Sequence, residues 1–316
     1  MRIVFMGTPE FAVPTLQALA ERAPEGLELA GVVTRVDKPV GRGRQMIPSP
    51  VKAYALARGI PVYQPGSLRK PAAQVVLREL ASDLLVVAAF GQILPSDVLV
   101  LPTHGALNVH ASLLPRWRGA SPIAAAILAG DNETGVTIMR MDEGLDTGPM
   151  LARRATPIGP DETTGELSGR LAHLGADLLI ETLPRWIAGQ IVPQPQDESQ
   201  ATMTTLLHKE QGRIDWRASA EQIARAVRAY TPWPGAYTTW SGQQLKVLRV
   251  RALPENDGRA PGQCFAVGAG RHIGLAVACG QGALALEVIQ LQGKRAAPAE
   301  EVLRGRPALA TATLGS

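Results

Sequence analysis

Cysteine is scarce in this sequence, and long apolar runs are absent from it. Only two of the 316 residues are cysteines, Cys264 and Cys279, and they form no C-x-x-C pair. This usage favours a reducing compartment and argues against a metal site. No apolar run reaches the roughly 20 residues that a membrane-spanning helix needs. The first residues, MRIVFMGTPEF, are typical of a buried strand and a turn, so we expect a cytoplasmic protein without a signal peptide.

Two glycine motifs that mark common enzymes of the α/β class are also missing. The first predicted strand ends in MGTPEF, without the G-x-G-x-x-G that brings the backbone close to a pyrophosphate, and this argues against a dehydrogenase. No G-x-S-x-G turn presents a nucleophilic serine. His104 and His173 have no ligand-like spacing with His110. A covalent acyl-enzyme and a metal-dependent reaction are therefore both disfavoured.

The apolar residues that are present predict two domains. They make up 46% of the chain, which is enough to bury more than one core. Strand and helix patterns alternate in the first part, which predicts a Rossmann-like, doubly wound and mostly parallel α/β sheet. A polar, proline-containing stretch then indicates a linker, and short strands between glycine-rich turns favour a small OB-like β-barrel. We predict a catalytic domain at 1–189, a linker at 190–207 and a C-terminal domain at 208–316.

The individual elements of the first domain follow from periodicity and from helix punctuation. One helix is marked by Ser49 as N-cap, Pro50 in the first turn and Gly59 after the end. The predicted helices are 9–22, 50–58, 71–81, 120–129 and 163–188. The predicted strands are 2–7, 27–34, 60–63, 83–90, 105–110 and 134–141.

The strand predicted at 105–110 carries an amide and an imidazole two residues apart. Side chains alternate along a strand, so Asn108 and His110 share one face while Leu107 and Val109 share the other. Open α/β sheets bind ligands at the carboxyl ends of their strands. Two neighbouring donors are suited to an oxyanion that develops on an acyl carbon. The alternative is that both side chains bond to nearby loops, and a lone histidine would favour that interpretation.

An acidic segment follows the strand predicted at 134–141. The stretch DEGLDTGP places Asp142, Glu143 and Asp146 between glycines, and we expect it to leave the sheet at the same carboxyl edge. An aspartate at this edge would hold His110 in orientation. The combination indicates acyl transfer to an external nucleophile.

Basic residues gather in two places. Residues 208–316 hold 14 Lys and Arg against 8 Asp and Glu, whereas residues 1–207 hold 18 against 20. The excess either aids solubility alone or indicates that the C-terminal domain meets a polyanion. The basic stretch RVDKPVGRGRQMIPS, residues 35–49, predicts a long loop inside the first domain. Such a loop is either a surface excursion or a functional element, and its length favours function.

These motifs resemble those of the folate-dependent formyltransferase family. LNVHASLLPRWRGASPI (107–123) and ETGVTIMRMDEGLDTGPML (133–151) are similar to the family's Asn-x-His, Ser-Leu-Leu-Pro and distal Asp. KPVGRGRQMIPSPVK (38–52), GRIDW (212–216) and YTPWPGAY (230–237) are similar to members that act on tRNA. Beyond about residue 250 the resemblance is one of length and strand pattern only.

The resemblance implies a reaction and a catalytic trio. The formyl group of 10-formyltetrahydrofolate would pass to the α-amino group of methionine on initiator Met-tRNA, without a metal. Asn108 and protonated His110 would hold the developing oxyanion, and Asp146 would orient His110 and help to relay a proton.

The resemblance also implies binding residues. The basic loop would contact the acceptor stem of the tRNA through Lys38, Arg42 and Arg44, and the C-terminal domain would add phosphate contacts. We expect a monomer. The folate would be received by the backbone of 90–94, by the acidic loop, by an apolar wall and by the Pro-terminated turn, with the residues Phe90, Ile93, Leu94, Ser112, Leu113, Leu114, Pro115, Met139 and Asp142.

Other functions remain open at this point. A sugar-nucleotide formyltransferase pairs the same kind of catalytic domain with a β-rich domain, although the basic loop and the basic C-terminal domain argue against it. Glycinamide ribonucleotide formyltransferase is a shorter chain, and a formyl-folate hydrolase would need no basic domain. A non-enzymatic RNA-binding protein would leave Asn108, His110 and Asp146 unexplained.

Overall fold

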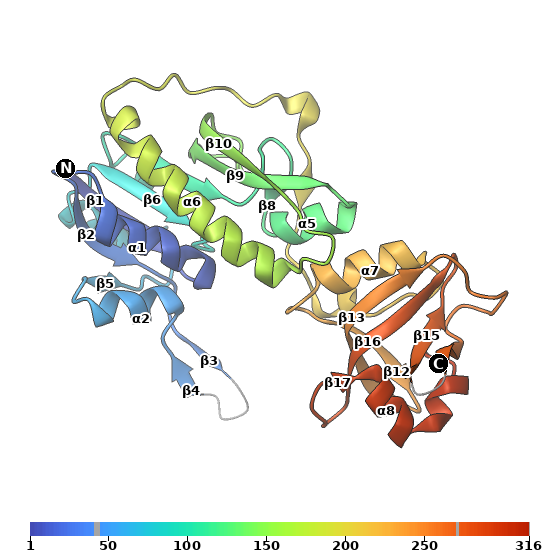
Figure 1. Cartoon of the computed structure of the whole chain (residues 1–316). Coiled ribbons are helices and arrows are strands. Elements are labelled where there is room, and N and C mark those ends of the chain that lie inside the picture. The colour runs from blue at the N-terminus through green and yellow to red at the C-terminus, as the bar shows by residue number, and fades with distance from the viewer. Residues whose placement is uncertain (41–44, 270–271, 316) are drawn as a thin grey trace. The chain divides into compact units, whose positions relative to one another are not determined.

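The computed structural model describes residues 1–40, 45–269 and 272–315 (Figure 1). The chain forms two compact units. The first unit consists of Met1–Pro122, Glu133–Pro157 and Ser168–Thr204, and the second of Ile123–Asn132, Ile158–Leu167 and Thr205–Ser316. None of the described helices is both long enough and apolar enough to cross a membrane.

A seven-stranded mixed sheet forms the centre of the first unit. Its first five strands in chain order are parallel, and the last two form an antiparallel hairpin at one edge. The central strands are continuous apolar runs because both faces of the sheet are covered. The order is β10 (Met150–Pro157), β9 (Glu133–Arg140), β7 (Ala106–His110), β6 (Leu84–Ala88), β1 (Arg2–Gly7), β2 (Glu28–Val33) and β5 (Val62–Tyr63).

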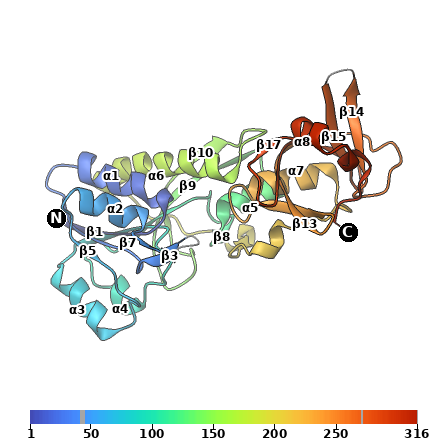
Figure 2. The ribbon, with the colours of Figure 1, turned by 90° about the horizontal axis from the view of Figure 1, so that it is seen from below.

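Helices cover both faces of this sheet, which confirms the doubly wound prediction. In Figure 2, α1 (Val13–Arg22) and α6 (Thr164–Ile187) lie over one face, and α3 (Pro71–Glu79) and α4 (Ser96–Leu99) lie over the other. Ser49 caps α2 (Pro50–Ala57) as predicted, because its side chain accepts a hydrogen bond from the Lys52 backbone. The remaining described helices before residue 208 are η1 (Glu10–Ala12), η2 (Glu198–Gln200) and α5 (Pro122–Ala129), the last of which lies almost wholly in the second unit.

The basic stretch 35–49 contains a β-ribbon where we expected a loop. Strand β3 (Lys38–Val40) pairs antiparallel with β4 (Gln45–Ile47). At the base of this hairpin, Lys52 Nζ donates to Asp37 Oδ2 at 2.6 Å and to Gln64 Oε1 at 2.7 Å. Gln64 Nε2 also donates to Asp37 Oδ1 at 2.8 Å, and the hydrogen bonds from Lys52 and Gln64 hold the pKa of the Asp37 carboxyl below its ordinary value, with that from Lys52 as the larger cause. The hairpin is therefore tied to α2 and β5 at its root.

The second unit is an antiparallel sheet with helices packed on it. Its strands run in the order β12 (Ala236–Trp240), β13 (Gln243–Leu253), β16 (Ala283–Leu291), β15 (His272–Ala278) and β14 (Cys264–Ala269), and β17 (Ala297–Pro298) pairs with β16. Across its described residues, no ladder joins β12 to β14. The sheet is thus open, and the prediction of a closed OB-like barrel is wrong in that respect.

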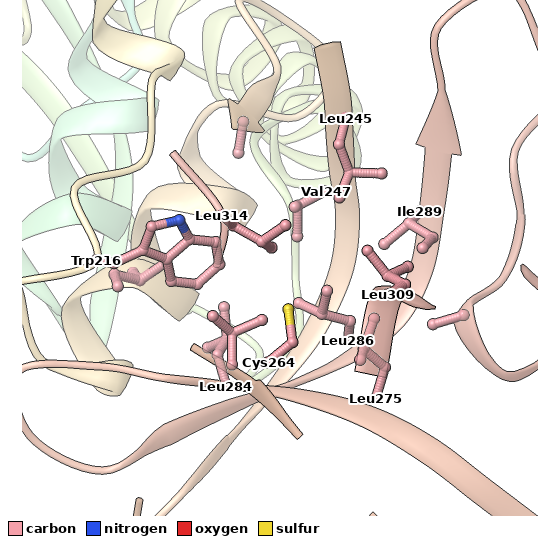
Figure 3. Packing of buried hydrophobic residues seen from close by; sticks show 14 of the residues in the cluster. Trp216, Leu245, Val247, Cys264, Leu275, Leu284, Leu286, Ile289, Leu309 and Leu314 are labelled. Carbon is pink, nitrogen blue, oxygen red and sulfur yellow. The ribbon is translucent and has the colours of Figure 1, made fainter. Parts of the chain in front are cut away.

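The core of this unit lies between the sheet and its helices. Figure 3 shows Cys264 between Leu284 and Leu286, with Trp216 and Leu245 farther out in the same cluster. Burial in this cluster raises the pKa of the Cys264 thiol to about 12, so the thiol is inert at neutral pH. The helices of the unit are η3 (Lys209–Gly212), α7 (Ala220–Ala229), α8 (Ala299–Gly305) and η4 (Pro307–Thr311).

Candidate active site

Asn108 and His110 lie at the end of β7 with their side chains on one face. Both are largely buried, at 9% and 6% exposure. On the opposite face, Val109 packs against α6 so closely that a Cβ added to Gly175 would lie 2.6 Å from Val109 Cγ1. The two-residue period of the strand therefore separates a polar face from a core face, as predicted.

Asp146 lies against both of these side chains. Asn108 Nδ2 donates to Asp146 Oδ1 at 3.2 Å, and His110 Nδ1 is 3.6 Å from Asp146 Oδ2. Asn108 and His110 thus form one cluster with Asp146, which is 38 residues from Asn108 in the sequence. An amide nitrogen carries two hydrogens, and one of those on Asn108 is used in the bond to Asp146.

Asp146 does not arrive from the edge of the sheet that we expected. Strand β9 runs antiparallel to β7, and its last residue, Arg140, lies opposite Leu107 near the beginning of β7. The 142–146 segment is the connection of a hairpin, and it folds back to Asn108 with Asp146 in a left-handed conformation of φ +55°. The expectation that this segment leaves the carboxyl edge is wrong, because a strand that reverses direction carries its end to the opposite edge.

The second nitrogen of His110 meets the backbone of the following turn. His110 Nε2 lies 3.1 Å from the carbonyl oxygen of Trp117, and a carbonyl can only accept, so this contact requires a hydrogen on Nε2. Trp117 itself has φ +60°, an uncommon conformation for a large side chain. Ser112 Oγ donates to the Arg116 carbonyl at 2.6 Å and closes the same turn. Both ring nitrogens of His110 therefore face oxygen atoms, so the ring plane is fixed.

The sequence did not indicate two further residues, Gly119 and Arg118, that hold Asp146 and its loop in place. Strand β8 (Arg118–Gly119) pairs with β11 (Met203–Thr204), and the Gly119 backbone N–H donates to Asp146 Oδ2 at 2.9 Å. A Cβ at Gly119 would overlap the carbonyl oxygen of Thr204, and the residue has φ +107°, so the position requires glycine. No local pattern indicates this role, since it depends on a strand some 85 residues away.

Arg118 is the second supporting residue that the sequence did not indicate. We predicted only a basic turn, yet this side chain is 3% exposed and makes two hydrogen bonds to Glu198, at 2.7 and 2.9 Å. Those bonds raise the pKa of the Arg118 guanidinium and hold the pKa of the Glu198 carboxyl below its ordinary value. A buried arginine that remains charged needs such a partner.

Comparisons with known proteins agree with this arrangement. A formyl transferase family model matches residues 1–183, and a model of the formyl transferase C-terminal domain matches residues 206–307. The methionyl-tRNA formyltransferase of Geotalea daltonii is 50% identical over 315 residues, which cover 100% of this chain and 98% of that protein. The chain belongs to the formyl transferase family. The second family match extends the likeness into the part where only length and strand pattern had indicated it.

Two further comparisons concern a second relative and a solved structure. The methionyl-tRNA formyltransferase of Citrifermentans bemidjiense is 50% identical over 305 residues, which cover 96% of this chain and 93% of that protein. An N-formyltransferase from Helicobacter canadensis, solved with folinic acid and dTDP-3-aminofucose, has a TM-score of 0.65 at 17% identity. The match covers 90% of this chain and 98% of the Helicobacter canadensis protein. At this identity the likeness shows the fold alone. The prediction of a formyl-transferring enzyme is confirmed.

The residues predicted to bind folate divide into buried and exposed groups. Phe90 and Leu94 pack inside a core cluster of the first unit, and Ile93 between them is 69% exposed. Met139 is buried and lies opposite Asn108 in the β7–β9 register. Ser112, Leu114 and Pro115 are buried, Leu113 is partly buried and Asp142 is exposed. Most of these side chains are thus buried within the first unit, and their role in folate binding stays a prediction.

The residues predicted to bind tRNA lie on the hairpin or beyond what is described. Lys38 begins β3 and is exposed. Arg42 and Arg44 lie outside the described residues. Within the part of the chain that the structure does describe, no group of three or more His, Cys, Asp and Glu side chains is placed to hold a metal ion.

Proposed function

We propose that this enzyme transfers the formyl group of 10-formyltetrahydrofolate to the α-amino group of methionine on initiator Met-tRNA. The observation that carries the proposal is identity of 50% with proteins named methionyl-tRNA formyltransferase over the whole chain. The cluster of Asn108, His110 and Asp146 supports the chemistry, because it combines an amide donor with an imidazole whose orientation is fixed.

In the proposed reaction the neutral amine attacks the formyl carbon. A bond forms between the amine nitrogen and that carbon, and the carbonyl electron pair moves to oxygen. Asn108 donates its second amide hydrogen to the oxyanion at little cost in reorganisation, because its amide is already held by Asp146, whereas His110 donates by giving up its contact with the Trp117 carbonyl. The bond between carbon and the folate nitrogen then breaks. The amine loses a proton and the folate nitrogen gains one, and Asp146 and His110 assist this relay.

Each substrate is assigned its own surface. Folate would lie against the 90–94 segment and the turn at 112–115, close to the catalytic trio. The tRNA would meet the β3–β4 hairpin, and its phosphates would meet residues 208–316 of the second unit, which hold the basic excess. On β13 of that unit, Lys246, Arg249 and Arg251 are exposed and follow one another along the strand. We propose this strand as a phosphate-binding surface, and we retain 1–189 and 208–316 as catalytic and tRNA-binding domains.

A formylation assay with purified protein tests the proposal. The protein is incubated with 10-formyltetrahydrofolate and one of four acceptors: initiator Met-tRNA, elongator Met-tRNA, a dTDP-amino sugar or water alone. We expect rapid formylation of initiator Met-tRNA and much slower reaction with the other three. Preferred formylation of the amino sugar would establish the sugar-nucleotide alternative, and release of formate without an acceptor would establish a hydrolase.

A further inference from the structure

Residues 194–204, which we call the strap, run along the loops that carry the catalytic side chains. Gln194 and Met150 exchange two backbone hydrogen bonds of 2.8 Å each. Further along, β11 pairs with β8, and the Arg118 backbone N–H donates to the Thr202 carbonyl at 2.9 Å. All of these contacts lie within the first unit. The strap, although it falls within the segment predicted as a linker, is therefore hydrogen-bonded to the catalytic loops.

One side chain of the strap binds two backbone carbonyls of the loop, that of Asp146 and that of a residue two positions after it. Gln196 Nε2 donates to the carbonyl of Asp146 at 2.8 Å and to the carbonyl of Gly148 at 2.7 Å. Its Oε1 accepts from Arg118 Nε at 2.9 Å. Both amide hydrogens and the amide oxygen are engaged, so the amide plane has one defined orientation. A Cβ at Gly148 would overlap the Arg140 carbonyl, which leaves this part of the loop little room to move.

The orientation of Gln196 depends in turn on an ion pair between a buried arginine and an exposed glutamate. Arg118 is 3% exposed, whereas the Glu198 side chain that binds it is 71% exposed. Two parallel hydrogen bonds fix the guanidinium plane, and its remaining Nε–H is directed at Gln196. The chain of contacts runs from Glu198 through Arg118 and Gln196 to the backbone of Asp146.

We propose that Gln196 is a positioning residue for Asp146, and that Arg118 and Glu198 hold Gln196 in its working orientation. This inference rests on the proposed function, since it concerns the same catalytic trio. Hydrogen bonds from Asn108 and from the Gly119 backbone direct the Asp146 carboxylate, and Gln196 fixes the peptide from which that carboxylate extends. A displacement of about 1 Å at a reacting group lowers rates by up to roughly 100-fold. The strap thus acts on the rate of transfer more than on substrate binding.

The first test compares two glutamines of the strap. Gln196→Ala removes the bonds to the Asp146 loop, whereas Gln200→Ala removes an amide that donates only to Asp197 within the strap itself. For Gln196→Ala we expect single-turnover formylation to fall roughly 10-fold to 100-fold, with KM for folate and for tRNA nearly unchanged. Gln200→Ala should keep the wild-type rate. Circular dichroism and melting temperature establish that both variants fold.

A second variant tests the chain of contacts without shortening a side chain at the loop. Glu198→Gln keeps the shape of an exposed residue and removes the charge that binds Arg118. We expect a loss of the same kind as for Gln196→Ala, with a smaller magnitude. If both variants retained full single-turnover rates, the proposal would be overturned.

A double-mutant cycle separates positioning of Asp146 from a general structural effect. Gln196→Ala is measured in the wild-type protein and in an Asp146→Asn background. If Gln196 acts through the Asp146 carboxylate, its loss should shrink to less than about 3-fold in that background, because coupled residues are not additive. An equal fold-loss in both backgrounds would show that Gln196 acts elsewhere. Wild-type protein that fails to formylate Met-tRNA would refute the proposed function instead.

Discussion

Asn108 is the residue whose proposed role is most directly tied to charge that develops during transfer. It sits at the end of a buried strand, and its amide donates to Asp146 at 3.2 Å. That bond fixes the amide plane before substrate binds, so the second amide hydrogen has a defined direction. Pre-orientation of this kind is what makes a neutral donor effective against an oxyanion.

Replacement of Asn108 by alanine tests this role. We expect Asn108→Ala to lower turnover by roughly 100-fold to 1,000-fold, the usual effect of losing one oxyanion donor. Folate affinity, measured by calorimetry, should change little. Asn132→Ala serves as control, because that asparagine is exposed. Near-full turnover of Asn108→Ala at saturating substrates would exclude the oxyanion role.

Gly119 offers a second test at the scale of one residue. Gly119 and Gly59 both have positive φ, +107° and +68°, but only Gly119 has a backbone carbonyl where a Cβ would stand. Gly59→Ala should cost about 1 kcal/mol from its left-handed backbone alone. Gly119→Ala should cost more, because β8 must separate from β11, and turnover should fall as the N–H to Asp146 is displaced. Urea unfolding and formylation rates measure the two effects, and equal stability losses for both variants would contradict this account.

Among the elements, the β3–β4 hairpin carries the exposed Lys38. Its root is tied by the bonds among Asp37, Lys52 and Gln64, and Gln64 Nε2 also donates to the Arg35 carbonyl at 2.7 Å. A hairpin held at its base is suited to position a bound tRNA and not merely to attract it. The expected consequence is an effect on rate.

Arg42→Ala tests whether the hairpin positions the tRNA. We expect it to depress single-turnover formylation at saturating tRNA more than it weakens tRNA binding, and to leave folate affinity intact. Arg69→Ala is the matched control, because Arg69 is an exposed arginine elsewhere in the same unit. A normal rate at saturating tRNA combined with weaker binding would mean that the hairpin is only an electrostatic anchor.

At the scale of the whole molecule, charge is divided between the two parts of the chain. Residues 208–316 carry a balance of +6, and residues 1–207 a balance of −2. Lysine and arginine side chains that bind tRNA phosphates release counterions. The logarithm of the binding constant therefore falls linearly with the logarithm of the salt concentration. This term is independent of sequence, so the choice between initiator and elongator tRNA has another source.

Removal of charge from β13 tests this division. Arg249 and Arg251 are each 67% exposed, and their contacts to Glu287 are long, at 3.7 and 3.9 Å. The double variant Arg249→Ala with Arg251→Ala should weaken initiator and elongator tRNA alike. It should also reduce the salt slope by about one unit for each phosphate contact removed. Filter binding at several salt concentrations measures both, with Arg69→Ala as control. An unchanged slope would place the phosphate contacts elsewhere.

The sequence by itself determined the features that depend on neighbouring residues. A strand period of two put Asn108 and His110 on one face, and Ser49 with Pro50 marked the start of α2. Continuous apolar runs predicted buried strands at 2–7 and 83–90, where the structure has β1 and β6. Each of these follows from local stereochemistry, which the same short stretch carries wherever it is placed.

Tertiary structure decided the features that depend on contacts between segments far apart in the sequence. The direction of β9, the open edge of the second sheet, the burial of Arg118 and the hydrogen bonds of the strap to Asp146 have no local pattern. Judged from the sequence alone, Arg118 and Gln196 are ordinary surface residues. The fold makes them partners, although some 80 positions separate them in the sequence. The energy of such pairs depends on both partners and on the water they exclude, so it is absent from either stretch alone.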